Sequence, residues 1–118
     1  MDVVVTVPKG KWAEWLAEGD LPGEEAQFNS HFWISARNLP DIISGERVYI
    51  VAHGKLRGYA PLILVEPKCR LWPQRACLIR QGGAVAVTIP EPIRGFQGFR
   101  YRWWERETEM PFPDFKEP

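Results

Sequence analysis

The sequence has no long hydrophobic run and only two cysteines, Cys69 and Cys77. A helix that crosses a bilayer needs roughly 18 or more consecutive apolar residues, and no run in this chain approaches that length. Residues 1–6 carry no basic stretch ahead of an apolar one, so no signal peptide is predicted. Two cysteines are too few for the disulfide framework of a small secreted protein. We therefore expect a cytoplasmic protein that does not associate with membranes.

Patterns typical of metal sites and of nucleophilic enzymes are also missing. Zinc ligands usually come in pairs two to four residues apart, whereas seven residues separate Cys69 from Cys77, and His31 and His53 stand far from both. There is no Gly-x-Ser-x-Gly motif, no evident Cys–His pairing, and no glycine-rich phosphate loop that leads into a helix. The sequence therefore predicts neither a metal nor a cofactor, and it favours a binding protein over an enzyme.

The formal net charge is zero, but the charges are sorted along the chain. Residues 47–106 carry eleven Lys and Arg against three acids, whereas residues 1–46 have a net charge of −5 and residues 107–118 a net charge of −3. Aromatic residues are interleaved with the basic ones in the middle segment. Cations beside flat rings suit a polyanion whose bases can stack, so this pattern favours a nucleic-acid partner.

Short apolar runs separated by Gly and Pro predict a mainly β fold. Strand-like runs cover residues 3–7, 32–35, 47–52, 55–60 with 62–65, 76–80, 84–89 and 99–104. The pairs His53-Gly54 and Gly82-Gly83 are typical of two-residue hairpin turns. Trp12, Trp15 and Leu16 share the spacing of a helical stripe, which predicts a short helix over residues 9–18.

This order of elements predicts one small α+β domain. Six or seven short strands with one or two short helices are typical of a mostly antiparallel pseudo-barrel, which we expect to span residues 1–106. Residues 107–118 are acidic and contain proline, so we expect them to form a tail laid over the surface.

The run 99–104 offers the clearest candidate for binding. Side chains alternate along a strand, so Phe99, Tyr101 and Trp103 are predicted to face the core. The opposite face is then predicted to present Arg100, Arg102 and Trp104. Arginine pairs with phosphate oxygens and indole stacks on bases, so this face suits nucleic acid. The alternative is that both arginines are solvated and the acidic tail covers Trp104.

Two further strands carry candidate binding residues. On the first hairpin, Lys55, Arg57 and Tyr59 share one predicted face, and they either follow a nucleic-acid strand or form an ordinary polar outer face. On the strand near residue 33, an outward Trp33 followed by Ser35 and Arg37, with Asn38 at the rim, is a candidate base pocket. The competing interpretation of Trp33 is a buried core residue.

The hairpin sequence resembles a known superfamily. Gly45-Glu46-Arg47-Val48-Tyr49-Ile50-Val51, followed by Gly54-Lys55-Leu56-Arg57-Gly58-Tyr59-Ala60, is similar to the central hairpin of the PUA-like superfamily, particularly its ASCH and EVE branches. Phe32-Trp33-Ile34 is similar to a strand of EVE-like members. The resemblance implies a small pseudo-barrel with a cleft between the first helix and the sheet, and binding of RNA or of a modified base in DNA.

One segment resembles the ASCH motif Gly-x-Lys-x-x-Glu-x-Arg only in part. Lys11 and Glu14 match its spacing, but Lys9 replaces the glycine and Leu16 replaces the arginine. Lys11 and Glu14 are therefore weak catalytic candidates. We predict a nucleic-acid-binding module, for RNA in preference to DNA, that reads a modified base in the cleft. The alternatives are an ASCH-like hydrolase or ribonuclease acting on RNA or a nucleoside derivative, and a protein-interaction domain.

Overall fold

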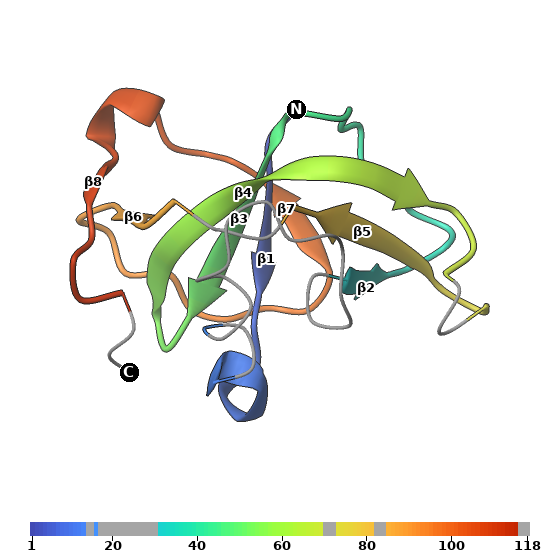
Figure 1. The fold of residues 1–118 in the computed structure, drawn as a ribbon, viewed down its shortest axis with the longest axis horizontal. Helices are drawn as coiled ribbons and strands as arrows, with labels where there is room; N and C mark the ends of the chain where they lie inside the picture. The colour runs from blue at the N-terminus through green and yellow to red at the C-terminus, as the bar shows by residue number, and fades with distance from the viewer. Residues whose placement is uncertain (14–15, 17–30, 70–72, 82–84, 116–118) are drawn as a thin grey trace.

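The fold is built on a curved sheet of six strands (Figure 1). A computed structural model of the chain describes residues 1–13, 16, 31–69, 73–81 and 85–115. The six strands are β1 (Val3–Thr6), β2 (His31–Ile34), β3 (Arg47–Ala52), β4 (Lys55–Glu66), β5 (Ala76–Arg80) and β7 (Phe99–Tyr101). The remaining elements are two short strands, β6 (Val87–Thr88) and β8 (Met110–Pro111), and two 3-10 turns, η1 (Lys9–Lys11) and η3 (Arg106–Thr108).

The strand order in the large sheet is β2-β5-β4-β3-β1-β7. All neighbouring strands pair antiparallel except β1 and β3, which run parallel. Strand β4 pairs with β3 through its first half and with β5 through its second, and its register shifts between Leu62 and Leu64. Figure 1 shows β4 arching over the molecule, with β5 and β2 at one end and β6 and β8 at the other. The sheet therefore curls into a half-barrel whose edge strands are β2 and β7.

The hairpin predicted around His53-Gly54 is confirmed. Both turn residues have positive φ, 49° at His53 and 75° at Gly54. Positive φ at both central residues is the geometry of a type I′ turn, whose twist matches that of the flanking strands. An X-Gly pair between alternating segments was sufficient to predict this turn because the glycine removes the steric cost of that conformation.

Both faces of the central strands are buried. One hydrophobic cluster contains Val3, Val5 and Ile50 and is covered by Trp12, and a second on the opposite face contains Val4, Tyr49 and Trp104. This two-sided burial explains why β1 consists of consecutive β-branched residues instead of an alternating pattern.

The second predicted hairpin is wrong. Strand β5 pairs with β4 on one side and with β2 on the other, so neither of its edges is open to residues 84–89. Strand β6 instead pairs with β8, more than twenty residues later in the sequence. The proposed turn at Gly82-Gly83 lies outside the described residues.

The mainly β class and the mostly antiparallel pairing are as predicted. Within the helix predicted over residues 9–18, η1 is followed by helical conformation at Trp12, Ala13 and Leu16, and the remaining positions lie outside the described residues. No helix among the described residues is long and apolar enough to cross a membrane. The C-terminal segment, through η3 and β8, packs against the sheet, with Phe112 and Phe115 half-buried.

Candidate functional site

A cavity lies between strand β2 at one edge of the curled sheet and the segment before β7 at the other. Its volume is about 670 Å³, and its walls come from β2, from the end of β1 with η1, and from residues 96–98 just before β7. Residues near both edge strands line one cavity, so it occupies the open side of the half-barrel. The site thus depends on the curvature of the sheet, in which β4 arches over the molecule (Figure 1).

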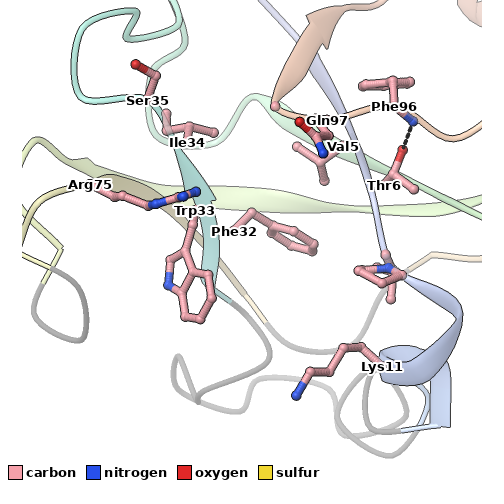
Figure 2. Close-up of a pocket in the computed structure, with 13 residues that line it drawn as sticks. Val5, Thr6, Lys11, Phe32, Trp33, Ile34, Ser35, Arg75, Phe96 and Gln97 are labelled. Carbon is pink, nitrogen blue, oxygen red and sulfur yellow. Dashed lines mark hydrogen bonds between the residues drawn. The ribbon is translucent and has the colours of Figure 1, made fainter.

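Three aromatic residues line the cavity. Phe32 and Trp33 come from β2, and Phe96 comes from the segment before β7. Trp33 is 38% exposed, whereas Phe32 and Phe96 are half-buried against the two hydrophobic clusters. Figure 2 shows the rings of Phe32 and Trp33 extending from β2 in different directions, with Phe32 directed toward β1. The lining therefore includes aromatic side chains, of which Trp33 is the most accessible.

The charged side chains among the described residues that line this cavity, Lys11 and Arg75, are cationic. Lys11 extends into the cavity from η1, and Arg75 lines it from just before β5 (Figure 2). No carboxylate is present among the described lining residues. Gln97, Ser35 and Thr6 add an amide and two hydroxyls. Such a lining favours an anionic ligand that also carries an apolar or aromatic face.

The segment that carries Phe96 and Gln97 is held against β1. The Phe96 N–H donates a hydrogen bond to Oγ1 of Thr6 at 3.1 Å (Figure 2). A Cβ at Gly95 would lie 3.2 Å from Cγ2 of Thr6, so Gly95 permits this close approach. Gly98 has a φ of 72°, a conformation that favours glycine. These contacts fix one wall of the cavity relative to the sheet.

Only two of the four residues predicted to form the base pocket line the cavity. Trp33 and Ser35 line the cavity, and both come from β2 or the residue after it. Arg37 and Asn38 are exposed in the turn that follows and are not part of the lining. Within this turn the Arg37 N–H donates to Oγ of Ser35 at 3.2 Å.

The exposed orientation predicted for Arg57 is wrong. Its side chain is only 1% exposed, and its Nε donates to the Ala52 carbonyl at 2.8 Å. Its guanidinium also donates to the Phe115 carbonyl at 3.2 Å and lies 5.4 Å from the ring centre of Trp12. Burial lowers the pKa of Arg57 from its usual value.

A β-bulge explains this inward orientation. Ile50 pairs with Gly58, but Val51 pairs with Leu56, so Arg57 is an extra residue in β4. An extra residue interrupts the strict alternation of side chains on which the prediction depended. The other two candidate binding residues of this hairpin, Lys55 and Tyr59, differ in exposure. Lys55 is exposed near Phe112, whereas Tyr59 is half-buried with the Arg47 guanidinium 4.0 Å from its ring centre.

The predicted face of Arg100, Arg102 and Trp104 does not form. Strand β7 ends at Tyr101, so the alternation does not extend to residue 104. Trp104 is buried, as in the alternative that the acidic tail covers it, and its Nε1 donates to Glu109 at 2.9 Å. Trp103, which we predicted to face the core, is 45% exposed.

The two arginines of this face have different surroundings. Arg102 is half-buried and forms an ion pair with Asp2 at 3.2 Å, and Arg106 reaches the same carboxylate at 2.7 Å. Arg100 is exposed, and its guanidinium lies 4.5 Å from the ring centre of Phe96 at the cavity. Of the basic candidates from the two predicted faces, Arg57 is thus buried and Arg102 is ion-paired, whereas Lys55 and Arg100 are exposed.

Glu109 organises a buried polar cluster that the sequence did not reveal. Its carboxylate accepts hydrogen bonds from the Tyr49 hydroxyl at 2.6 Å and from Arg47 at 3.1 Å, besides the one from Trp104. Burial, and then the bond to this carboxylate, raise the pKa of Tyr49. Glu109 lies in the acidic segment that we predicted to form a surface tail. No local sequence pattern indicated that its side chain would be buried.

The remaining candidates were Lys11, Glu14 and the cysteines. Lys11 lines the cavity, whereas Glu14 lies outside the described residues. Cys69 and Cys77 are buried without a disulfide, and burial, followed by the contact with Cys69, raises the pKa of Cys77 to about 12. Among the described residues no group of three His, Cys, Asp or Glu side chains is placed to hold a metal ion.

No protein-family model matches this sequence, and neither curated proteins nor solved structures show significant similarity to it. The PUA-like resemblance of the hairpin therefore stays a prediction.

Proposed function

We propose that the chain is a nucleic-acid-binding module that takes an unpaired base of a single strand into the cavity on the open side of the half-barrel. The observation that carries this proposal is the lining itself: an accessible Trp33 beside Phe32, with Lys11 and Arg75 and no carboxylate among the described lining residues. The cavity volume of about 670 Å³ falls within the range of roughly 300–1,000 Å³ that is usual for ligand pockets.

The two kinds of lining residue match the two parts of a nucleotide. A base stacked on an aromatic side chain gains about 1–3 kcal/mol, and the exposed face of Trp33 is the surface for this contact. The phosphate is negatively charged, and Lys11 and Arg75 supply the complementary charge. Gln97 and Ser35 carry donors and acceptors for the edge of the base. RNA is the preferred partner, because proteins recognise RNA chiefly through unpaired bases stacked on aromatic side chains.

We also propose that the fold is a PUA-like pseudo-barrel and that the protein acts in the cytoplasm. The curled β sheet and the observed β3–β4 hairpin support the first of these. We assign the cavity lined by η1 and β2 to the helix–sheet cleft that the resemblance implies, and we propose it as the place for a modified base. The hydrolase alternative depends on Lys11 together with Glu14. Because Glu14 lies outside the described residues, the hydrolase alternative gains no support.

Binding of fluorescently labelled single-stranded RNA, measured by anisotropy at low salt, tests the proposal. We expect Trp33→Ala to weaken binding about tenfold or more, because it removes the stacking surface. Lys11→Ala and Arg75→Ala should each weaken binding of all sequences alike and lower its salt dependence. Lys55→Ala is the matched control, because Lys55 is an exposed cation that does not line the cavity.

Two results would contradict the proposal. One is the absence of binding to any single-stranded RNA or DNA at low salt. The other is RNA binding that Trp33→Ala leaves unchanged while Lys55→Ala weakens it, because the cavity would then not be the site. Equal affinity for matched RNA and DNA strands would contradict only the preference for RNA.

A further inference from the structure

We infer that the bound strand continues out of the cavity over Phe96 to Arg100, so that the ligand is an oligonucleotide of at least two nucleotides and not a free nucleotide. This inference rests on the proposed function and adds a second phosphate site to it. Phe96 lines the cavity, and the Arg100 guanidinium lies 4.5 Å from the centre of its ring. Arg100 therefore lies next to a lining residue of the cavity without being part of the lining itself.

The charge of Arg100 is available to a ligand. No carboxylate among the described residues lies within ion-pair distance of Arg100. Two other arginines have carboxylate partners: Arg102 pairs with Asp2, and Arg47 pairs with Glu109. Arg100 is also exposed, whereas those two arginines are half-buried. A ligand phosphate is therefore a suitable counter-ion for Arg100.

The position of Arg100 is well defined. Strand β7 pairs with β1 in a register that sets Arg100 opposite Val4, and Phe96 is fixed by its bond to Thr6. A guanidinium that stacks on a ring keeps its N–H donors in its own plane, directed outward from the ring edge. These donors match the two oxygens of a phosphate in a bidentate contact. The stacked arrangement therefore orders the side chain before a ligand arrives, which lowers the entropic cost of the contact.

This geometry separates two classes of ligand. A nucleoside monophosphate places its base on Trp33 and its single phosphate near Lys11 and Arg75, and it has no group that extends to Arg100. An oligonucleotide places the base in the same cavity and brings the next phosphate across Phe96. Arg100 should consequently affect binding of oligonucleotides alone.

The experiment compares two probes, a set of ribonucleoside 5′-monophosphates and a short single-stranded oligoribonucleotide. Each is titrated against the wild type, Arg100→Ala, Arg100→Lys and the control Lys55→Ala. We expect Arg100→Ala to weaken oligonucleotide binding about three- to tenfold and to reduce the slope of log K against log salt by about 0.7, the value for one phosphate contact on a single strand. Binding of the monophosphates should be unchanged. Arg100→Lys should keep the salt slope but lose part of the affinity, because lysine lacks the planar fork.

The outcomes distinguish this inference from the proposed function. If Arg100→Ala alters neither probe while Trp33→Ala weakens both, the strand path is wrong and the cavity remains the site. If Arg100→Ala weakens both probes equally, Arg100 belongs to the cavity and the second phosphate site is wrong. If the wild type binds neither probe, the proposed function and this inference both fail. Thermal unfolding of Arg100→Ala should match the wild type, because the residue is exposed.

Discussion

Single arginines in this chain have different roles according to what faces them. Arg57 donates to main-chain carbonyls in the interior, and Arg102 and Arg106 share the carboxylate of Asp2. Arg75 lines the cavity, and Arg100 stacks at its margin. Residue type alone therefore does not identify a binding cation. The carboxylates and carbonyls that neutralise or hold a guanidinium come from distant parts of the sequence.

Asp2 gives a prediction about pH. Burial opposes ionisation of its carboxyl, but hydrogen bonds from the Arg47 N–H, Arg106 and Arg102, with the Arg106 charge, outweigh this and hold its pKa below the usual 3.8. A carboxyl whose pKa is lower in the folded state contributes stability above its unfolded pKa, and that stability is lost as the pH falls through the folded value. We expect Asp2→Asn to reduce the free energy of unfolding at neutral pH by about 2 kcal/mol.

Urea unfolding of the wild type and Asp2→Asn over a range of pH tests this contribution. The difference in unfolding free energy should be constant above about pH 4 and should shrink below it, because Asp2 then binds a proton in the unfolded chain before it does so in the folded one. The exposed Asp114 provides the control Asp114→Asn, which should leave stability nearly unchanged. A difference between wild type and Asp2→Asn that persists at the lowest pH would contradict the assigned role of the charge.

At the scale of elements, the local sequence was enough to predict the first hairpin. The other strand pairings depend on contacts between residues far apart in the sequence. The His53-Gly54 turn joins two alternating runs, and all the information needed for it lies within that segment. The pairing of β6 with β8 depends on a partner far along the chain, and the bulge at Arg57 has no sequence signal. Long-range pairing and bulges therefore account for the errors in strand assignment.

Gly58 gives a prediction about the contact between β4 and the segment before β6. A Cβ at this position would lie 2.5 Å from the main-chain oxygen of Val85. The two segments are joined there by a pair of hydrogen bonds between Tyr59 and Val85, at 3.0 and 2.8 Å. Because the clash is with backbone, it requires a backbone shift, so we expect Gly58→Ala to lower the free energy of unfolding by about 2–3 kcal/mol.

Gly10→Ala is the matched control for Gly58→Ala. A Cβ at Gly10 would meet no atom within 4 Å, and its φ is not positive. Alanine has a higher helix propensity than glycine, so Gly10→Ala should leave the free energy of unfolding unchanged or raise it slightly. Denaturant unfolding of the two variants checks both expectations. If Gly58→Ala and Gly10→Ala had the same free energy of unfolding, the close approach of Val85 to Gly58 would not constrain the residue at position 58.

At the scale of the whole molecule, the candidate site depends on how the sheet curls. Trp33 and Ser35 could be predicted because both lie on one face of a single recognisable strand. Arg75, Phe96 and Gln97 could not, because they precede strands and reach the cavity only when the two sheet edges approach each other. Lys11 was singled out by its resemblance to a motif, with no indication that it would face β2. The charge sorting along the sequence was informative about composition, but the fold neutralises or buries several of those cations.

The salt dependence of RNA binding distinguishes two sets of phosphate contacts. One set is made by the basic residues predicted from the sequence, and the other by the cations in and next to the cavity. Four contacts by Lys55, Arg57, Arg100 and Arg102 would give a slope of log K against log salt near −3, at about −0.7 for each phosphate on a single strand. Contacts by Lys11, Arg75 and Arg100 alone give about −2 by the same rule. We expect the value near −2, because Arg57 is buried and Arg102 is paired with Asp2. Combining Lys11→Ala, Arg75→Ala and Arg100→Ala should bring the slope close to zero, whereas Lys55→Ala should leave it unchanged. A slope near −3 that falls by about 0.7 in Lys55→Ala would instead place the phosphates along the β3–β4 hairpin and away from the cavity.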